Sequence, residues 1–323
     1  AWLRAEELNL TEFLGDTALP NISGLGFEVN GEVPVDNYQQ GGLEGAFSVN
    51  HISQGAYELE QTEGTLSLTE DHFSAGLQTR RQDQHLSTDL RIDDIWMQQP
   101  YTSVNIRASN INPAYWMQDT TYAGSISLTG SLQGEGFYPD TSLWDYSVRV
   151  TDSRVMNQNI SRAEFEGRVS GQYASNRTRV RIDESEASLE AEVHNLQGIP
   201  RFSYHMATNN FNLEELRLTD SFSTGITASV SGEGQGNAPE NLRLSTTVRI
   251  DSSTVNGEYI EQLLATVNVA DTVATIEQAD LRSTIAEASL DGRMHLVRLY
   301  DPQNRLDVDI EIEDAGSLAP LAE

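Results

Sequence analysis

Apolar and polar residues alternate along most of the chain, as in Val104, Ile106 and Ala108, or in Val248 and Ile250. A period of two places successive side chains on opposite faces of a β-strand, with one face apolar and the other in water. The alternating runs recur about every ten to twelve residues and are separated by Gly, Asn, Asp and Ser. This pattern predicts an all-β antiparallel sheet in which strands follow one another through tight turns.

The pattern also repeats at a longer period of about 100 residues. The segment Ser147–Ser153 reads SVRVTDS and the segment Thr247–Ser253 reads TVRIDSS, and the same offset relates Ile160 to Ile260. The sequence therefore predicts three repeat units, 1–107, 108–207 and 208–312, with 313–323 opening a truncated fourth. We expect about seven or eight strands in each unit and one elongated body formed by stacking of the units.

Two segments test the strand prediction. Residues 258–269 hold apolar residues at helical spacing without Gly or Pro, but the equivalent residues 158–169 alternate and contain Gly167, which favours a strand in both. Short helices are expected near the unit starts, at 10–14 and 213–218, where Asn9 and Asn212 could cap them, and Pro113 occupies the equivalent first-turn position.

Spaced glycines end one strand in each unit, at Gly31, Gly134 and Gly234. We expect these glycines to supply a bend, a bulge or a turn with positive φ. A phosphate-binding loop is the sharper alternative, but it requires a following helix and usually a lysine, and neither is present.

Charge narrows the function classes. The chain has 49 acidic and 20 basic residues, a formal net charge of −29, and no lysine. Because no basic stripe is available to displace counterions, nucleic-acid binding is excluded as a function class. An acidic surface without lysine is typical of proteins solvated in high salt, so a halophilic source is one hypothesis, and ordinary anionic solubility is the other.

The chain contains no cysteine, and no run approaches the roughly 18 apolar residues of a membrane-spanning helix. The first residues lack the positively charged start and the apolar core of a signal peptide, and the first residue is not methionine. We expect a segment of a longer polypeptide whose anchor or export signal lies elsewhere.

Candidate chemistry is sparse. The six histidines lack metal-ligand spacing, no G-x-S-x-G motif occurs, and the dispersed acids single out no catalytic pair. The densest acidic group, Asp307, Asp309, Glu311 and Glu313, alternates with Leu306, Val308, Ile310 and Ile312 and therefore predicts a strand with an acidic water-facing side. We expect no catalytic residue, no metal site and no cofactor.

The order of phrases within each unit carries a resemblance. Unit two runs from Asn110-Ile111-Asn112 through Gly134-Glu135-Gly136, Val148-Arg149-Val150-Thr151-Asp152-Ser153 and Ala187-Ser188-Leu189, and unit three follows the same order. This order resembles the repeating middle of the TamB and AsmA-like family of bacterial envelope proteins, most clearly over residues 108–300. The first unit keeps the opening and the glycines but lacks the V-R-V-x-D-S strand.

The resemblance implies a fold and a function. Such proteins are anchored in the inner membrane by an N-terminal helix and cross the periplasm as a long antiparallel sheet curled into an open trough. They are associated with moving phospholipid to the outer membrane, and outer-membrane protein assembly with a TamA-type barrel partner is a further implied role. The resemblance favours acyl chains in an apolar groove, and the residues expected to line it are Val148, Val150, Phe165, Val169, Val248, Ile250, Val267, Val269, Leu290 and Met294.

Three alternatives remain. Alternation alone favours packing of the aliphatic residues in a closed sandwich or solenoid core, and it is the resemblance that favours the open trough. A different function class is an extracellular adhesin or surface-layer array that binds protein or carbohydrate and is stabilised by cations. A glycan-cleaving β-helix enzyme would need a focused carboxylate cluster, which the sequence does not show.

Overall fold

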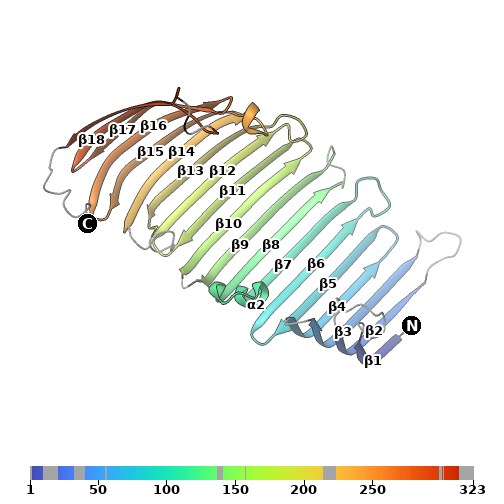
Figure 1. The fold of residues 1–323 in the computed structure, drawn as a ribbon. Coiled ribbons are helices and arrows are strands. Elements are labelled where there is room, and N and C mark those ends of the chain that lie inside the picture. Colours follow the sequence, from blue (N-terminus) through green and yellow to red (C-terminus); the bar gives the residue numbers. More distant parts are fainter. Residues whose placement is uncertain are drawn as a thin grey trace. The chain divides into compact units, whose positions relative to one another are not determined.

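The computed structural model describes residues 2–9, 21–32, 41–54, 57–136, 141–156, 158–213, 223–297, 300 and 302–312. These residues form an all-β architecture that divides into two compact units, Ala1–Gly171 and Gln172–Glu323. Unit 1 contains strands β1 to β10 and unit 2 contains strands β11 to β19 (Figure 1). The three sequence repeats therefore do not coincide with the two compact units.

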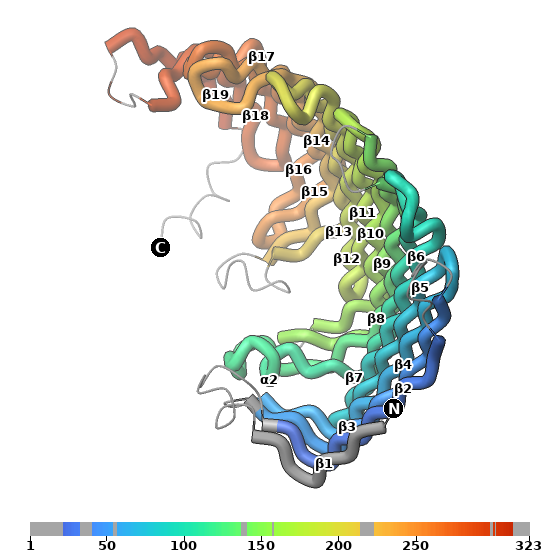
Figure 2. Tube along the Cα trace, turned by 90° about the vertical axis from the view of Figure 1, so that its right-hand side faces the viewer, coloured from blue at the N-terminus to red at the C-terminus, as the bar shows by residue number. Residues whose placement is uncertain are grey.

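In unit 1 each strand pairs antiparallel with the next in sequence, so the chain forms a continuous meander. The register leaves an open, curled sheet, and in Figure 2 its strands change direction part-way along their length. The strands are β1 Trp2–Asn9, β2 Asn21–Glu32, β3 Gly42–Gln54, β4 Tyr57–Leu68, β5 His72–Arg81, β6 Gln84–Asp93, β7 Tyr101–Ile111, β8 Gly124–Glu135, β9 Leu143–Val155 and β10 Gln158–Ser170.

Unit 2 repeats this organisation with antiparallel neighbours in chain order. The predicted strand at 258–269 is confirmed as β16. The strands are β11 Tyr173–Ile182, β12 Ser185–His194, β13 Arg201–Phe211, β14 Thr224–Gln235, β15 Arg243–Val255, β16 Glu258–Ala270, β17 Val273–Ser283, β18 Ala286–His295 and β19 Arg305–Ile312.

The 100-residue period corresponds to six strands, because β7 to β12 align in sequence with β13 to β18. Among the described residues, the expectation of seven or eight strands holds for the first repeat, 1–107, in which β1 to β7 begin, and is wrong for the other two repeats, in each of which six strands begin. Most strands run for ten to thirteen residues, for example 13 in β9 and in β15, so the turns are fewer than the spacing of apolar runs suggested.

One helix follows β7, α2 at Pro113–Met117, and it confirms the predicted helix start in the middle repeat. Asn112 caps it, since its side chain accepts a hydrogen bond of 3.1 Å from the Ala114 amide. Trp116 of α2 stacks on Tyr57 of β4, and the Tyr57 hydroxyl donates to the Trp116 carbonyl at 3.2 Å. The expected helix at 10–14 and most of the one at 213–218 lie outside the described residues. Two 3-10 turns, η2 at Thr120–Tyr122 and η3 at Pro239–Asn241, complete the helical structure of the described part.

The V-R-V-x-D-S phrase forms a β-bulge. Asp152 of β9 and Ser252 of β15 adopt the left-handed region, with φ of 46° and 47°. Between the two pairs Leu128–Val150 and Gly124–Val155, β8 advances by four residues and β9 by five. The extra residue resets the alternation and returns Val155 to the face that carries Val150. The bulge therefore keeps one face apolar along the whole strand.

A buried hydroxyl occupies the centre of each of these bulges. Ser253 is 0% exposed and its Oγ accepts a hydrogen bond of 2.9 Å from the Thr227 amide, while Ser153 accepts one of 2.9 Å from the Ser127 amide. Each hydroxyl also lies within 3.1 Å of a carbonyl on its own strand, that of Asp251 or Thr151. The side chain thus replaces a ladder hydrogen bond that the register shift removes.

Candidate functional site

The candidate site is one continuous apolar face of each sheet. Directly paired residues of antiparallel strands lie on the same face, so the register identifies which residues share it. In unit 1 a row of paired residues crosses six strands, from β4 to β9. Its members in order are Leu66, Ala75, Leu90, Val104, Leu132 and Tyr146.

The four groove residues predicted in this unit belong to that face. Val148 lies opposite Phe165, and both Val150 and Val169 have partners on the same side of the sheet, Leu128 and Trp144 respectively. All four are half-buried: Val148, Val150, Phe165 and Val169. The alternation pattern therefore placed these side chains together.

The six residues predicted in unit 2 also share one face. The pairing carries the face from β15 to β18 through Leu244 opposite Val269, Val269 opposite Ala274, and Ala274 opposite Met294. All six predicted residues are half-buried: Val248, Ile250, Val267, Val269, Leu290 and Met294. Leu290 reaches the same face through its partner Ala279, after a register shift in β17.

Among the residues that the structure describes, no second layer covers the apolar face. Val49, Ala163 and Ala274 are the buried apolar residues of the described part, a set far smaller than the core of a closed sandwich requires. The strands make their extensive contacts with their sequence neighbours within each unit. On β19 the apolar side chains Val308 and Ile310 are exposed. Large aliphatic residues are therefore partly open to solvent.

The same face contains the side chains with the least solvent access. Thr62 and Thr79 are buried there and share a hydrogen bond of 2.8 Å between their hydroxyls, and the buried bulge serines Ser153 and Ser253 also belong to it. Within a single sheet, such burial requires neighbouring side chains to converge over the residue. Side chains on the apolar face therefore shield one another from solvent.

Glycines make room for aromatic rings on this face. A Cβ at Gly64 would lie 2.1 Å from the Phe47 ring, one at Gly134 2.6 Å from the Trp144 ring, and one at Gly234 2.9 Å from the Phe202 ring. In the glycine-rich segments around Gly31, Gly134 and Gly234, the expected positive φ occurs at neighbouring glycines such as Gly24, and these three residues themselves do not adopt it. They are strand residues whose missing side chain lets a backbone or ring approach, whereas Gly136 and Gly236 carry the positive φ.

The opposite face is polar and carries ion pairs between neighbouring strands. Arg168 and Asp145 form a bidentate contact of 2.6 and 3.1 Å, which holds the pKa of the Asp145 carboxyl below its ordinary value. Arg149 contacts Glu164 at 2.9 Å. Surface pairs of this kind contribute little to stability individually, but they keep this face hydrated.

A hollow of about 1030 Å³ lies on this polar face of unit 1, between β2 and β6. Its lining includes the polar-face residues Glu28, Glu63, Gln78 and Asp89. The alternation of apolar and polar residues did not predict this hollow, because the hollow depends on strand twist and on the short side chains at Ala46, Ser48 and Gly76.

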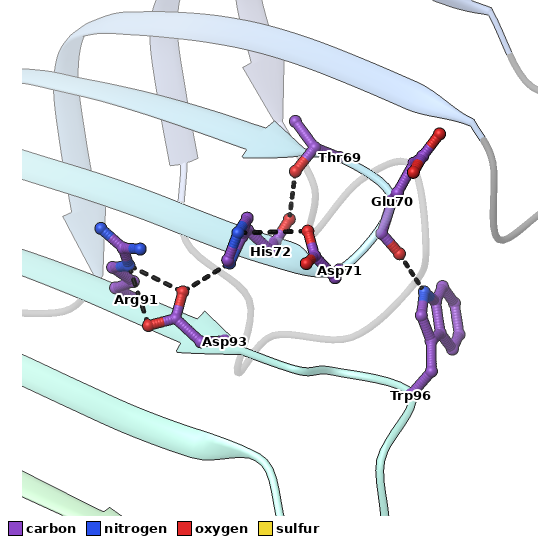
Figure 3. A network of polar contacts seen from close by, with 7 residues as sticks. All are labelled: Thr69, Glu70, Asp71, His72, Arg91, Asp93 and Trp96. Atoms are coloured by element: carbon purple, nitrogen blue, oxygen red, sulfur yellow. Dashed lines mark hydrogen bonds and ion pairs between the residues drawn. The ribbon is translucent and has the colours of Figure 1, made fainter.

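A polar network joins the ends of β5 and β6 (Figure 3). His72 Nδ1 lies 2.6 Å from Asp93 and its Nε2 lies 3.1 Å from Asp71, while Arg91 Nε donates to Asp93 at 2.8 Å. The Arg91 hydrogen bond is the main cause that lowers the pKa of Asp93, and His72 adds to it. The Thr69 hydroxyl donates to the His72 carbonyl at 3.5 Å, and among the described contacts the partners of the His72 imidazole are the carboxylates of Asp71 and Asp93. This geometry fits a contact that holds two strands together.

The acidic strand is confirmed as β19, with Asp307 and Glu311 on the polar face. Asp307 lies opposite Asp291 and Glu311 lies opposite Glu287, so carboxylates face one another across β18 and β19. Glu313 lies outside the described residues. Across the described part no group of three or more His, Cys, Asp or Glu side chains is arranged to hold a metal ion.

Comparisons with protein-family models, curated proteins and solved structures find no match to this chain. Within the described residues, no helix has the length and apolar character needed to cross a bilayer.

Proposed function

We propose that this chain is a non-catalytic segment that shields or conducts phospholipid acyl chains along its apolar face. The observation that carries the proposal is a face of paired aliphatic residues that runs across the strands of each unit, over which the described residues form no second layer. Burial of each methylene on such a face is worth about 0.8 kcal/mol, so about ten methylenes contribute roughly 8 kcal/mol before ordering costs.

The wider setting follows the resemblance to the TamB and AsmA-like family. On this proposal the chain belongs to a longer protein that is anchored in the inner membrane, and it carries lipid through the periplasm towards the outer membrane. A TamA-type barrel is the proposed outer-membrane partner. The register supports the lipid role because the ten residues proposed to line the groove lie on one face within each unit.

The test uses a matched pair of substitutions on β15. Val248→Asp places a carboxylate on the apolar face, whereas Thr247→Asp places the same charge one residue away on the polar face. The purified variants are incubated with a photo-activatable phospholipid, and crosslinked lipid is measured by mass spectrometry. We expect crosslinking to fall at least tenfold in Val248→Asp and to persist in Thr247→Asp. Equal crosslinking of the two variants, with unchanged circular dichroism, would contradict the proposal.

The second candidate is an array that binds carbohydrate or protein through its polar face. The hollow between β2 and β6 favours it, because Glu28, Asn50, Glu63 and Asp89 offer hydrogen-bonding groups there. Glycan-array binding that is lost in Asn50→Ala and retained in Val248→Asp would support this candidate over lipid transport.

A further inference from the structure

Corresponding turns of the three repeats carry exposed apolar side chains. These turns join β6 to β7, β12 to β13, and β18 to β19, and we call them the apolar tips. Met97 in the first tip and Val297 in the third are each 67% exposed, and Tyr300 is fully exposed. The exposed large apolar residues of the tips include Trp96, Met97, Leu196, Ile199, Val297 and Tyr300.

The apolar tips carry few charges although the whole chain is strongly acidic. The first tip, residues 94–100, reads DIWMQQP and has one acidic residue, Asp94. The second tip, residues 195–200, reads NLQGIP and has no acidic or basic residue. The third tip, residues 296–302, holds one arginine and one aspartate. The small number of charges at these three turns contrasts with the acidic strands between them, and a turn rich in apolar residues is what contact with an apolar phase requires.

The backbone of the first two tips is anchored in the same way. Gly136 N donates to the Pro100 carbonyl at 3.3 Å, and Gly236 N donates to the Pro200 carbonyl at 3.0 Å. The indole N–H of Trp96 donates to the Glu70 carbonyl at 2.6 Å (Figure 3). Because its polar atom already has an acceptor, the Trp96 ring can enter an apolar phase without losing a hydrogen bond to water.

The distance between the tips favours a bilayer over a protein as the partner that contacts them. In unit 2 the second and third tips are six strands apart, or about 29 Å at a strand spacing of about 4.8 Å. The turn at Asp271 and Thr272 lies between them and is polar. A stable protein interface requires a contiguous patch of about 800 Å² on each partner, which isolated turns do not form. A bilayer is continuous and meets each turn separately.

We propose that the apolar tips insert into the interface of a zwitterionic lipid bilayer. The net charge of −29 disfavours an anionic surface, so attraction depends on apolar insertion alone. This proposal concerns the turns at the strand ends and stands whether or not the apolar face binds acyl chains.

The experiment is flotation of the full chain with vesicles of phosphatidylcholine. The triple variant Met97→Asp, Ile199→Asp and Val297→Asp changes one exposed residue in each tip. The control variant Gln82→Asp, Asn256→Asp and Thr272→Asp adds the same charge at other turns. We expect the wild type and the control to float and the tip variant to bind at least tenfold less. Vesicles with brominated acyl chains should quench tryptophan fluorescence in the wild type and quench it less in Trp96→Phe.

Two results would overturn the inference. One is failure of the wild type to float, or equal flotation of the tip variant. The other is self-association of the wild type that increases with concentration in light scattering and is absent in the tip variant, while neither protein floats with vesicles. The tips would then be contacts between copies of this protein. Photo-crosslinking of soluble lipid to the apolar face separates this test from that of the proposed function, since the tip variant should retain it.

Discussion

Replacement of Ser253 by alanine tests how the sheet keeps one apolar face. The Ser253 hydroxyl is fully buried and is the acceptor for the Thr227 amide at 2.9 Å, at a point where the register shifts between Gly225 and Ala228. Ser253→Ala leaves that amide without an acceptor and without water. An unsatisfied buried donor costs about 1–3 kcal/mol, so the free energy of unfolding should fall by that amount.

Two measurements address this prediction. Urea unfolding followed by circular dichroism gives the stability change, and hydrogen exchange of the Thr227 amide should accelerate about 5- to 150-fold if the change opens the bulge locally. Ser245→Ala, an exposed serine on the same strand, is the control and should change stability by less than about 0.5 kcal/mol. Ser153→Ala in unit 1 should add its own effect independently. Equal stability of Ser253→Ala and Ser245→Ala would refute the role assigned to the hydroxyl.

Three further predictions concern salt, pH and close packing. Raising NaCl from about 0.1 to 1 M shortens the Debye length from about 10 to 3 Å, which screens repulsion between carboxylates, so the thermal midpoint of unfolding should rise. Glu311→Gln should reduce that rise because Glu311 lies opposite Glu287. A midpoint that does not depend on salt would contradict this prediction. The pKa of Asp145 is lowered in the folded protein, so its carboxylate stabilises the fold above the ordinary carboxyl pKa of about 3.9. This contribution is lost as the pH falls through the folded pKa. The stability of Asp145→Asn should therefore fall less steeply with acid than that of the wild type. Gly234→Ala should destabilise by about 1–3 kcal/mol in chemical unfolding, because its Cβ would lie 2.5 Å from a backbone oxygen, whereas Gly42→Ala meets nothing closer than 3.8 Å and should not.

Alternation was sufficient to predict the fold class and the sharing of one face. The period of two is a direct consequence of strand geometry, so Val248 and Ile250 could be placed on one side from their spacing alone. The helix start at Asn112 and Pro113 was also predictable, because capping depends on local residues. The function of the apolar face stays a prediction.

Other features depend on contacts that a single sequence does not reveal. The Asp-Ser pair of the repeat was visible in the sequence. That it forms a bulge could be seen only from the pairing with β8, which lacks the extra residue. Gly134 and Gly234 looked like turn residues, yet each is explained by a backbone oxygen and an aromatic ring of neighbouring strands that come close to it. The apolar tips left a signal in the sequence, since IWMQQP at residues 95–100 breaks the acidic pattern, but exposure decides whether such a run is core or surface.

The meander has a consequence for how the chain can assemble. Residues paired across strands lie close in sequence, and even Tyr101 and Glu135 are separated by only 34 positions. Short separations carry a small loop-closure cost, so each new hairpin can dock as soon as it has been synthesised or has emerged from a translocation pore. Further repeat units can thus be added to such a chain by duplication without slowing the folding of the strands that precede them.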